Sequence, residues 1–294
     1  MNDSGENGGS GAVGETLNPP RRRRTLVVAV AGVLLVVAIT GVAIAATSSK
    51  TPSAGAAVIV RKALVSTLAT NSVAFTLSES VSAADTTVAV SGSGECDLSS
   101  ALCGVTLNYS GLLASAGTIR TVYSGGSVYL NLGDALSGLA STPWISIPVN
   151  TSSSASLGIS QNPLSGLSLL ASEGAAVTND GSVSENGQTM TQYTVTIDGS
   201  QVQHLVTSAT AKLPSWMAAA ASKDTIGTIV ETVDIDSAGR LGYVSANVSS
   251  TVAGTTVNVT SAETITGYGL PVDVTVPPAS QVTSITSLSQ LTGL

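Results

Sequence analysis

The amino-acid sequence predicts an α+β protein built on an antiparallel β-sheet and preceded by one transmembrane helix. Three observations support this fold class. Apolar and polar residues alternate in many short runs separated by glycine-containing turns, as in strands with one buried face. A stretch around residue 60 has the apolar periodicity of an amphipathic helix. A long uncharged apolar run follows four consecutive arginines near the start of the chain.

The composition fits a folded, β-rich domain. Charged residues make up 10% of the 294 positions and aromatic residues 3%, so the core must come mainly from Val, Leu and Ile, which favour strands. A chain of this length can bury a substantial core. The formal net charge of −7 and the absence of a basic stripe argue against nucleic-acid binding.

Residues 25–46 are the predicted transmembrane segment. They contain no charged side chain over 22 positions, and about 20 apolar residues span a bilayer. The arginines at 21–24 place the N-terminus in the cytoplasm and the main domain outside, by the positive-inside rule. A cleaved secretory signal is the alternative, because Ala43-Ile44-Ala45 provides small residues at a possible cleavage site. In that case the protein is secreted.

Composition divides the rest of the chain into further segments. Residues 1–24 are rich in Gly, Asn and Ser and are predicted to be a disordered cytoplasmic tail. Residues 47–56 are small and polar and are read as a linker. The main extracytoplasmic domain is predicted over 57–280, which leaves 281–294 as a C-terminal tail.

The first predicted element of the main domain is a helix over 56–71. Val60, Leu64 and Leu68 repeat at a spacing of four residues and form its apolar stripe. Predicted helices also interrupt the later part of the domain, at 163–174 and 200–221.

Period-two alternation predicts two sets of antiparallel strands with tight turns. The first set covers 73–77, 88–90, 105–109 and 128–132, and the second covers 189–197, 229–235, 242–248 and 255–260. The segment PVDVTVPP at 271–278 also alternates and is predicted as a closing strand with prolines at its ends.

The two cysteines fit an oxidising compartment. Cys96 and Cys103 enclose six residues between two predicted strands, where a disulfide would link a hairpin. Two free thiols are the alternative. No metal site is expected, because zinc takes four ligands and His204 is the single histidine.

No catalytic arrangement is predicted, and no cofactor. His204 lies beside Val202 and Leu205 on a predicted helix, where a packed or surface histidine is expected rather than a general base. Asp234 and Asp236 are read as solvated residues around a turn. The glycines serve turns and form no phosphate-binding loop. An enzyme is therefore not expected.

Four short motifs follow one another along the main domain. They are GSVYL at 126–130, TPWISIP at 142–148, DSAGRL at 236–241 and YGLPVDVTVPP at 268–278. Their order, after an N-terminal helix and a long sheet, resembles the LppX/LprG-type envelope lipoproteins of mycobacteria and related actinobacteria. The resemblance covers about residues 55–280. It implies a highly curved antiparallel half-barrel that wraps a few helices over an apolar cavity and carries lipids or glycolipids.

The chain departs from that family in its anchor. Many members have a lipobox cysteine at the end of the signal, whereas no cysteine here precedes Cys96. Lipid anchoring at that position is therefore excluded, and the signal anchor at 25–46 takes its place. A protein held by its own helix hands its cargo on locally.

The predicted function is that of a membrane-anchored extracytoplasmic protein that holds a lipid or glycolipid for envelope lipid transport. A one-layer sheet must cover its apolar face, and covering helices of small residues leave room for a ligand. The alternative is a structural or adhesive surface domain with a packed core and no small ligand. The sequence names no protein partner. The residues predicted to line the cavity, with Trp144 at its rim, are Val73, Phe75, Leu77, Val88, Val90, Leu107, Leu130, Trp144 and Val195.

Overall fold

A computed structural model describes most of the predicted main domain. Several predicted segments lie outside the described residues: the N-terminal tail, the transmembrane segment, the first part of the linker and nearly all of the two later helices, including His204. Among the residues described, no helix is both long and apolar enough to cross a membrane. The described residues are 51–83, 86–111, 114, 117–131, 133, 141–148, 175–185, 187–200, 225–226, 228–252 and 255–285.

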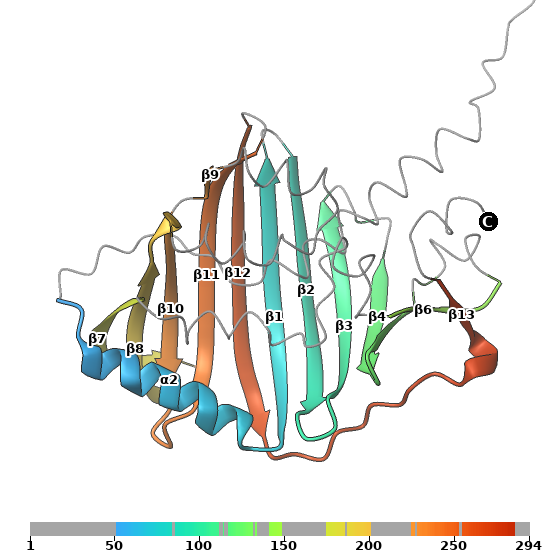
Figure 1. The fold of residues 1–294 in the computed structure, drawn as a ribbon, viewed down its shortest axis with the longest axis horizontal. Helices are drawn as coiled ribbons and strands as arrows, with labels where there is room; N and C mark the ends of the chain where they lie inside the picture. The colour runs from blue at the N-terminus through green and yellow to red at the C-terminus, as the bar shows by residue number, and fades with distance from the viewer. Residues whose placement is uncertain are drawn as a thin grey trace, which may run out of the picture.

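The described strands form one large sheet (Figure 1). It has 13 strands, in the order β13-β6-β5-β4-β3-β2-β1-β12-β11-β10-β8-β7, and the short β9 pairs with β11. The pairs are antiparallel except that β13 is parallel to β6. The strands are β1 Ser72–Ala83, β2 Thr86–Asp97, β3 Leu102–Gly111, β4 Thr118–Ser124, β5 Ser127–Asn131, β6 Trp144–Pro148, β7 Ala176–Glu185, β8 Gln188–Ile197, β9 Thr225–Ile226, β10 Ile229–Ile235, β11 Leu241–Val252, β12 Thr255–Tyr268 and β13 Val282–Ser284.

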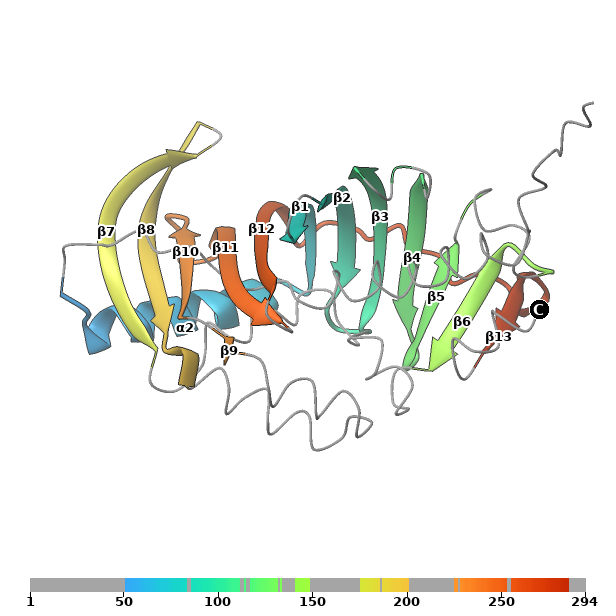
Figure 2. The ribbon, with the colours of Figure 1, turned by 90° about the horizontal axis from the view of Figure 1, so that it is seen from above.

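The predicted antiparallel strands are confirmed, but the two predicted sets belong to the same sheet. The first strand, β1, lies between β2 and β12, so Val73 is opposite Cys96 on one side and Tyr268 on the other. This pairing joins the start of the domain to its end. Figure 2 shows the strands side by side along the sheet, with β7 and β8 curving at one end.

Helix α2, Ala54–Leu68, is the one α-helix whose bounds the described residues define. Ser53 caps it by accepting a hydrogen bond from the backbone N–H of Ala56. The helix contacts β7, β8, β10 and β11. Val60 and Leu64 are buried as predicted, whereas Leu68 is 41% exposed. The predicted stripe is therefore wrong at its last position.

Thr67, one residue earlier, continues the buried side of α2 in place of Leu68. A helix turns once per 3.6 residues, so two successive steps of four drift off one face. The Thr67 hydroxyl donates to the carbonyl of Ala63 and accepts from the backbone N–H of Leu241, each at 2.9 Å. The C-terminal end of α2 is thereby bonded to the start of β11.

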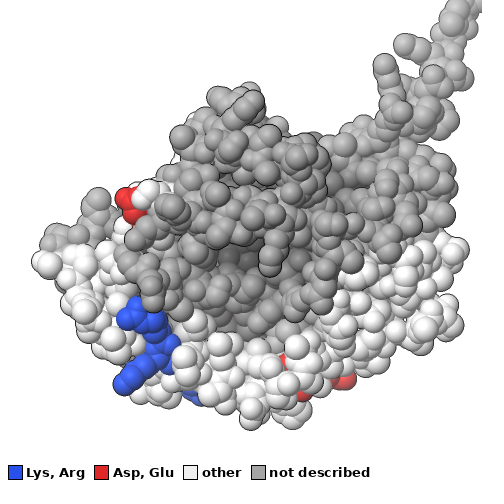
Figure 3. Space-filling model, in the orientation of Figure 1, with Lys and Arg blue, Asp and Glu red and all other residues white. Residues whose placement is uncertain are grey.

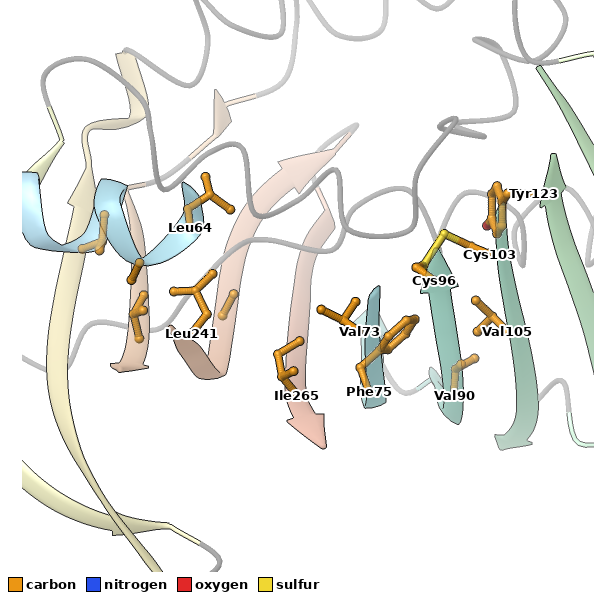
Figure 4. Packing of buried hydrophobic residues seen from close by; sticks show 14 of the residues in the cluster. Leu64, Val73, Phe75, Val90, Cys96, Cys103, Val105, Tyr123, Leu241 and Ile265 are labelled. Atoms are coloured by element: carbon orange, nitrogen blue, oxygen red, sulfur yellow. A yellow bond between two sulfur atoms is a disulfide. The ribbon is translucent and has the colours of Figure 1, made fainter. Parts of the chain in front are cut away.

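The apolar core lies against one face of the sheet, which we call the inner face. In β1 this face carries the odd-numbered residues from Val73 onward, and the strand register extends it to the neighbouring strands. Figure 4 shows Val73, Phe75 and Ile265 from β1 and β12 close to Val90 and Val105 from β2 and β3. These strands bury side chains on alternate positions, as the sequence pattern predicts.

The predicted disulfide is confirmed. Cys96 in β2 and Cys103 in β3 are directly opposite each other and bonded, and both are buried on the inner face. The turn between them is held by Asp97, whose Oδ1 atom accepts a hydrogen bond from the backbone N–H of Ser99 at 2.9 Å. A structural disulfide is typical of an oxidising compartment, which suggests an extracytoplasmic location.

The predicted closing strand at 271–278 is wrong. These residues form no strand and cross below β1–β5 toward β13 (Figure 1). The N–H of Asp273 donates to the side chain of Glu95 at 3.0 Å, and Val274 lies against Gly104. Three prolines in this segment remove the N–H donors that a ladder needs. The last strand, β13, comes after residue 280, within the predicted tail.

Candidate functional site

Eight of the nine predicted lining residues share the inner face. The strand register places them on alternate positions of β1, β2, β3, β5 and β8. Leu77 and Val88 are partly buried and pack against the core cluster. The other six are at most 3% exposed, and they are Val73, Phe75, Val90, Leu107, Leu130 and Val195.

Trp144 does not share this face. It begins β6, next to Ile145, which is buried opposite Leu130 on the inner face. Successive strand residues point to opposite faces, so the half-buried Trp144 projects to the outer side. It lies near the end of the sheet, where β6 pairs with β13.

The sequence analysis missed three acidic residues on the inner face. Glu79 is in β1, Glu263 in β12 and Glu231 in β10. The register puts Glu79 opposite Ser261, and Glu263 opposite Leu77, so the two glutamates are diagonal neighbours on adjacent strands. Glu231 occupies the same transverse row as Glu79, with Ala246 and Ser261 between them. The acids thus lie within an otherwise apolar surface.

These carboxyl groups have unpartnered buried oxygens. Glu79 is 3% exposed and Glu231 is 1% exposed. Within the described part of the chain, both oxygens of Glu79, Oε2 of Glu231 and Oε1 of Glu263 are buried and make no hydrogen bond. A buried polar group without a partner is costly, and proteins retain few of them. Such groups call for a functional explanation.

Burial changes the protonation of all three acids. Desolvation, with a smaller contribution from the charge of Glu263, raises the pKa of Glu79 from 4.5 to about 8. Burial raises the pKa values of Glu231 and Glu263 to about 8 as well. At neutral pH the three groups are therefore mostly uncharged acids that can both donate and accept a hydrogen bond.

Two tyrosines lie within the electrostatic reach of Glu79. Tyr109 follows Val90 in the same transverse row, and Tyr123 is on β4. Burial, and to a smaller extent the charge of Glu79, raises the pKa values of both phenols. The charge of an ionised Tyr123 raises the pKa of Tyr109 further. Both phenols stay protonated at physiological pH. The inner face therefore combines aliphatic surface with a band of uncharged polar groups.

The residues beside the acids in the sheet are small. Ala246 and Ser261 separate Glu231 from Glu79, and Gly92 lies opposite Leu77 on the other side of β1. None of these three carries a side chain that could cover the carboxyl groups. Larger buried side chains, such as those of Phe75 and Val105, lie toward the N-terminal ends of β1 and β3.

Asp234 and Asp236, which the sequence analysis predicted to be solvated, have different roles. Asp236 forms the β10–β11 turn, where its Oδ1 accepts from the N–H groups of Ala238 and Arg240 and its Oδ2 pairs with the Arg240 guanidinium at 2.7 Å. Asp234 is 2% exposed, so its predicted solvation is wrong. It accepts a hydrogen bond from Gln192 at 3.0 Å. Both have partners, unlike the buried glutamate oxygens of the inner face named above.

A sequence signal for the three glutamates exists in the phase of the strands. In β1 the apolar positions Val73, Phe75 and Leu77 are odd-numbered, and Glu79 continues that series. Glu231 likewise shares phase with Ile229 and Val233. A buried charged residue is missed when its charge alone is used to assign it to the solvent face and its position in the strand alternation is ignored. Within the described ranges, no group of three or more His, Cys, Asp or Glu residues could hold a metal ion.

Comparison with known proteins finds similarity in structure only. No protein-family profile and no curated protein matches the sequence. The structure is similar to the lipoprotein LppX from Mycobacterium tuberculosis, with 14% identity, coverage of 75% of this chain and 98% of LppX, and a TM-score of 0.44. LprF from Mycobacterium bovis gives 15% identity, 78% and 98% coverage, and a TM-score of 0.43. An uncharacterised conserved protein from Thermus thermophilus gives 9% identity, 79% and 99% coverage, and a TM-score of 0.35. The predicted structural resemblance to LppX-type lipoproteins is therefore found.

Proposed function

We propose that this protein is an extracytoplasmic, membrane-anchored binding protein that holds a lipid or glycolipid against the inner face of its sheet, for transport within the cell envelope. The observation that carries the proposal is the inner face itself. It is aliphatic over many strands, yet it contains three glutamates with unpartnered buried oxygens. A ligand with apolar chains and a polar group matches both features.

The described architecture supports a ligand on the inner face. Among the described residues the strands form one sheet, and the main contacts of helix α2 are with β7, β8, β10 and β11. Ligand sites in proteins are mostly apolar, with a few polar groups that fix the orientation of the ligand. In the proposed arrangement the sheet acts as a half-barrel, and the eight inner-face residues predicted from the sequence contact the acyl chains. Trp144 is left out of this lining because of its register.

Two independent features support the proposed location. The disulfide between Cys96 and Cys103 favours an oxidising compartment. The apolar segment 25–46, with arginines before it, would hold the domain at the outer side of the membrane. This anchor is a prediction from the sequence, and a cleaved signal would release the same domain in soluble form.

Filling the proposed cavity tests the function. Val90 lies on the inner face opposite Glu79 and is 2% exposed, whereas its neighbour Ser91 is exposed on the outer face. The full chain is produced in an actinobacterial host as wild type, Val90→Trp and Ser91→Trp. Bound lipid is measured by organic extraction and mass spectrometry, and folding by thermal unfolding.

The two readings give opposite results. If the face binds lipid, Val90→Trp stays folded but loses its lipid, and Ser91→Trp keeps both. If the interior is packed, wild type carries no lipid and Val90→Trp unfolds by overpacking, at a cost of about 1–3 kcal/mol. The second result would make the protein a structural or adhesive surface domain.

A further inference from the structure

The Glu79–Glu263 pair is the least satisfied polar feature of the described fold. The two side chains are diagonal neighbours across β1 and β12, a relation in which the residues are about 7–8 Å apart and long side chains can meet. The charge of Glu263 adds to the effect of burial in raising the pKa of Glu79. Both oxygens of Glu79 are buried without a partner.

No described basic residue neutralises this pair. Arg61 and Lys62 are on α2, and Figure 3 shows basic side chains gathered over that helix. Arg120 is exposed on the outer side of β4, and Arg240 is paired with Asp236. Among the residues that the structure describes, the inner face therefore has acids without a matching positive charge.

The chemistry of the pair favours a cation over a neutral partner. Hydroxyl and ester groups can be bound by Ser, Asn or Gln side chains, without the mutual repulsion that two neighbouring acids develop when both ionise. A protonated amine removes that repulsion and offers three N–H donors for charge-assisted hydrogen bonds. A bound calcium or magnesium ion would need about six oxygen ligands. The described residues do not supply such a set.

We propose that Glu79 and Glu263 together form the recognition site for a protonated primary amine on the ligand, so that the inner face selects amine-bearing amphiphiles over neutral or anionic ones. This inference rests on the proposed lipid-binding function. When the ammonium group enters, one carboxyl releases its proton to solvent and the other stays able to donate a hydrogen bond. The apolar residues on either side of the pair hold the hydrocarbon chain.

Glu231 provides a matched control. It lies on the same face, is as deeply buried as Glu79, and has its pKa raised to about 8 by burial alone. It lacks an acidic neighbour across the strand, because it is opposite Ala246 and Val195. A general effect of removing a buried acid should therefore appear equally at Glu231, whereas an effect specific to the pair should not.

The test uses three amphiphiles with one hydrocarbon chain and different head groups: oleylamine, oleyl alcohol and oleic acid. The full chain in phosphatidylcholine nanodiscs is equilibrated with an equimolar mixture of the three, and native mass spectrometry measures the ratio of the bound species. The proteins are wild type, Glu79→Gln, Glu263→Gln and the control Glu231→Gln. Glutamine keeps the size and hydrogen-bonding capacity of each side chain and removes its charge.

The proposal predicts that wild type binds oleylamine about tenfold or more in preference to oleyl alcohol, as expected for charge-assisted hydrogen bonds. Glu79→Gln and Glu263→Gln should lose this preference while still binding the alcohol, and Glu231→Gln should keep it. Equal binding of amine and alcohol by wild type, or equal loss in all three variants, would overturn the amine site and leave lipid binding intact. Binding of none of the three probes would count against the proposed function as well.

Discussion

The two halves of the sheet share a strand pattern but differ in what they bury. In the half formed by β1–β6, the inner face is aliphatic and aromatic apart from Glu79 and Thr121, and a disulfide links β2 to β3. In the half formed by β7–β12, the inner face includes Glu231, Glu263 and small residues, and α2 packs over four of its strands. Apolar packing thus dominates the first half, whereas the second supplies most of the unpartnered polar groups. The acids gather where the halves meet.

The largest effect should come from the first half. Phe75 is 2% exposed, and its ring covers Gly94 on β2. Phe75→Ala should lower the free energy of unfolding by about 3–5 kcal/mol, because it removes a buried ring and leaves a cavity. Denaturant unfolding measures the change. The exposed neighbour Thr76→Ala is the control. A loss below about 1 kcal/mol for Phe75→Ala would mean that this half is not close-packed.

The three inner-face acids should make stability depend on pH. Glu79, Glu231 and Glu263 have folded-state pKa values of about 8, above the ordinary 4.5, so the folded state binds more protons than the unfolded chain between these values. Their stabilisation is complete below pH 4.5 and is lost as the pH rises through about 8. The decrease should be on the order of a few kcal/mol.

Variants assign this pH dependence to the acids. Unfolding of Glu231→Gln, followed from pH 5 to pH 9, should show a smaller decrease than that of wild type, because one of the contributing carboxyls is gone. A wild-type curve that is flat over this range would contradict the burial of these groups.

The disulfide should contribute somewhat less. Cys96→Ala with Cys103→Ala should lower the free energy of unfolding by about 2–3 kcal/mol, because the bond closes a short loop in the unfolded chain. Reduction of wild type should reproduce the effect, while the reductant leaves the double variant unchanged. If reduction and substitution both have no effect on the unfolding temperature, the hairpin is held by strand pairing alone.

The smallest effect is expected at the β10–β11 turn of the second half. Arg240 pairs with Asp236 and lies over the Tyr268 ring, with its guanidinium carbon 3.9 Å from the ring centre. Arg240→Gln should lower the free energy of unfolding by about 1 kcal/mol, as expected for a partly exposed ion pair and cation–π contact. The unfolding midpoint at low and high salt measures it. An unchanged midpoint in both buffers would show that neither contact contributes.

Local patterns in the sequence were enough to predict most of the long strands, the disulfide and the apolar inner face, although β4 and β7 were not predicted. Alternation placed Val73, Phe75 and Val90 on one face, because strand geometry fixes side-chain direction. The pairing of β1 with β12 could not be predicted this way, since it joins residues almost 200 positions apart through shared burial rather than local propensity.

The candidate site was predicted only in its apolar part. Glu79, Glu231 and Glu263 continue apolar series, but the sequence analysis did not single them out, because glutamate is rarely buried. The segment 271–278 shows the opposite error, because its alternation suggested a strand while its prolines and its path across other strands prevent pairing. Polar groups and proline are thus the places where tertiary context overrides the pattern.

The most direct test of the central claim is native mass spectrometry of the full chain, isolated in native nanodiscs from an actinobacterial host and followed by organic extraction. Lipid binding predicts a discrete added mass on the protein, at a fixed ratio, that is released as a lipid by the solvent. A chain that shows only its own mass, even after incubation with host lipid extract, would contradict lipid binding and indicate a structural or adhesive domain.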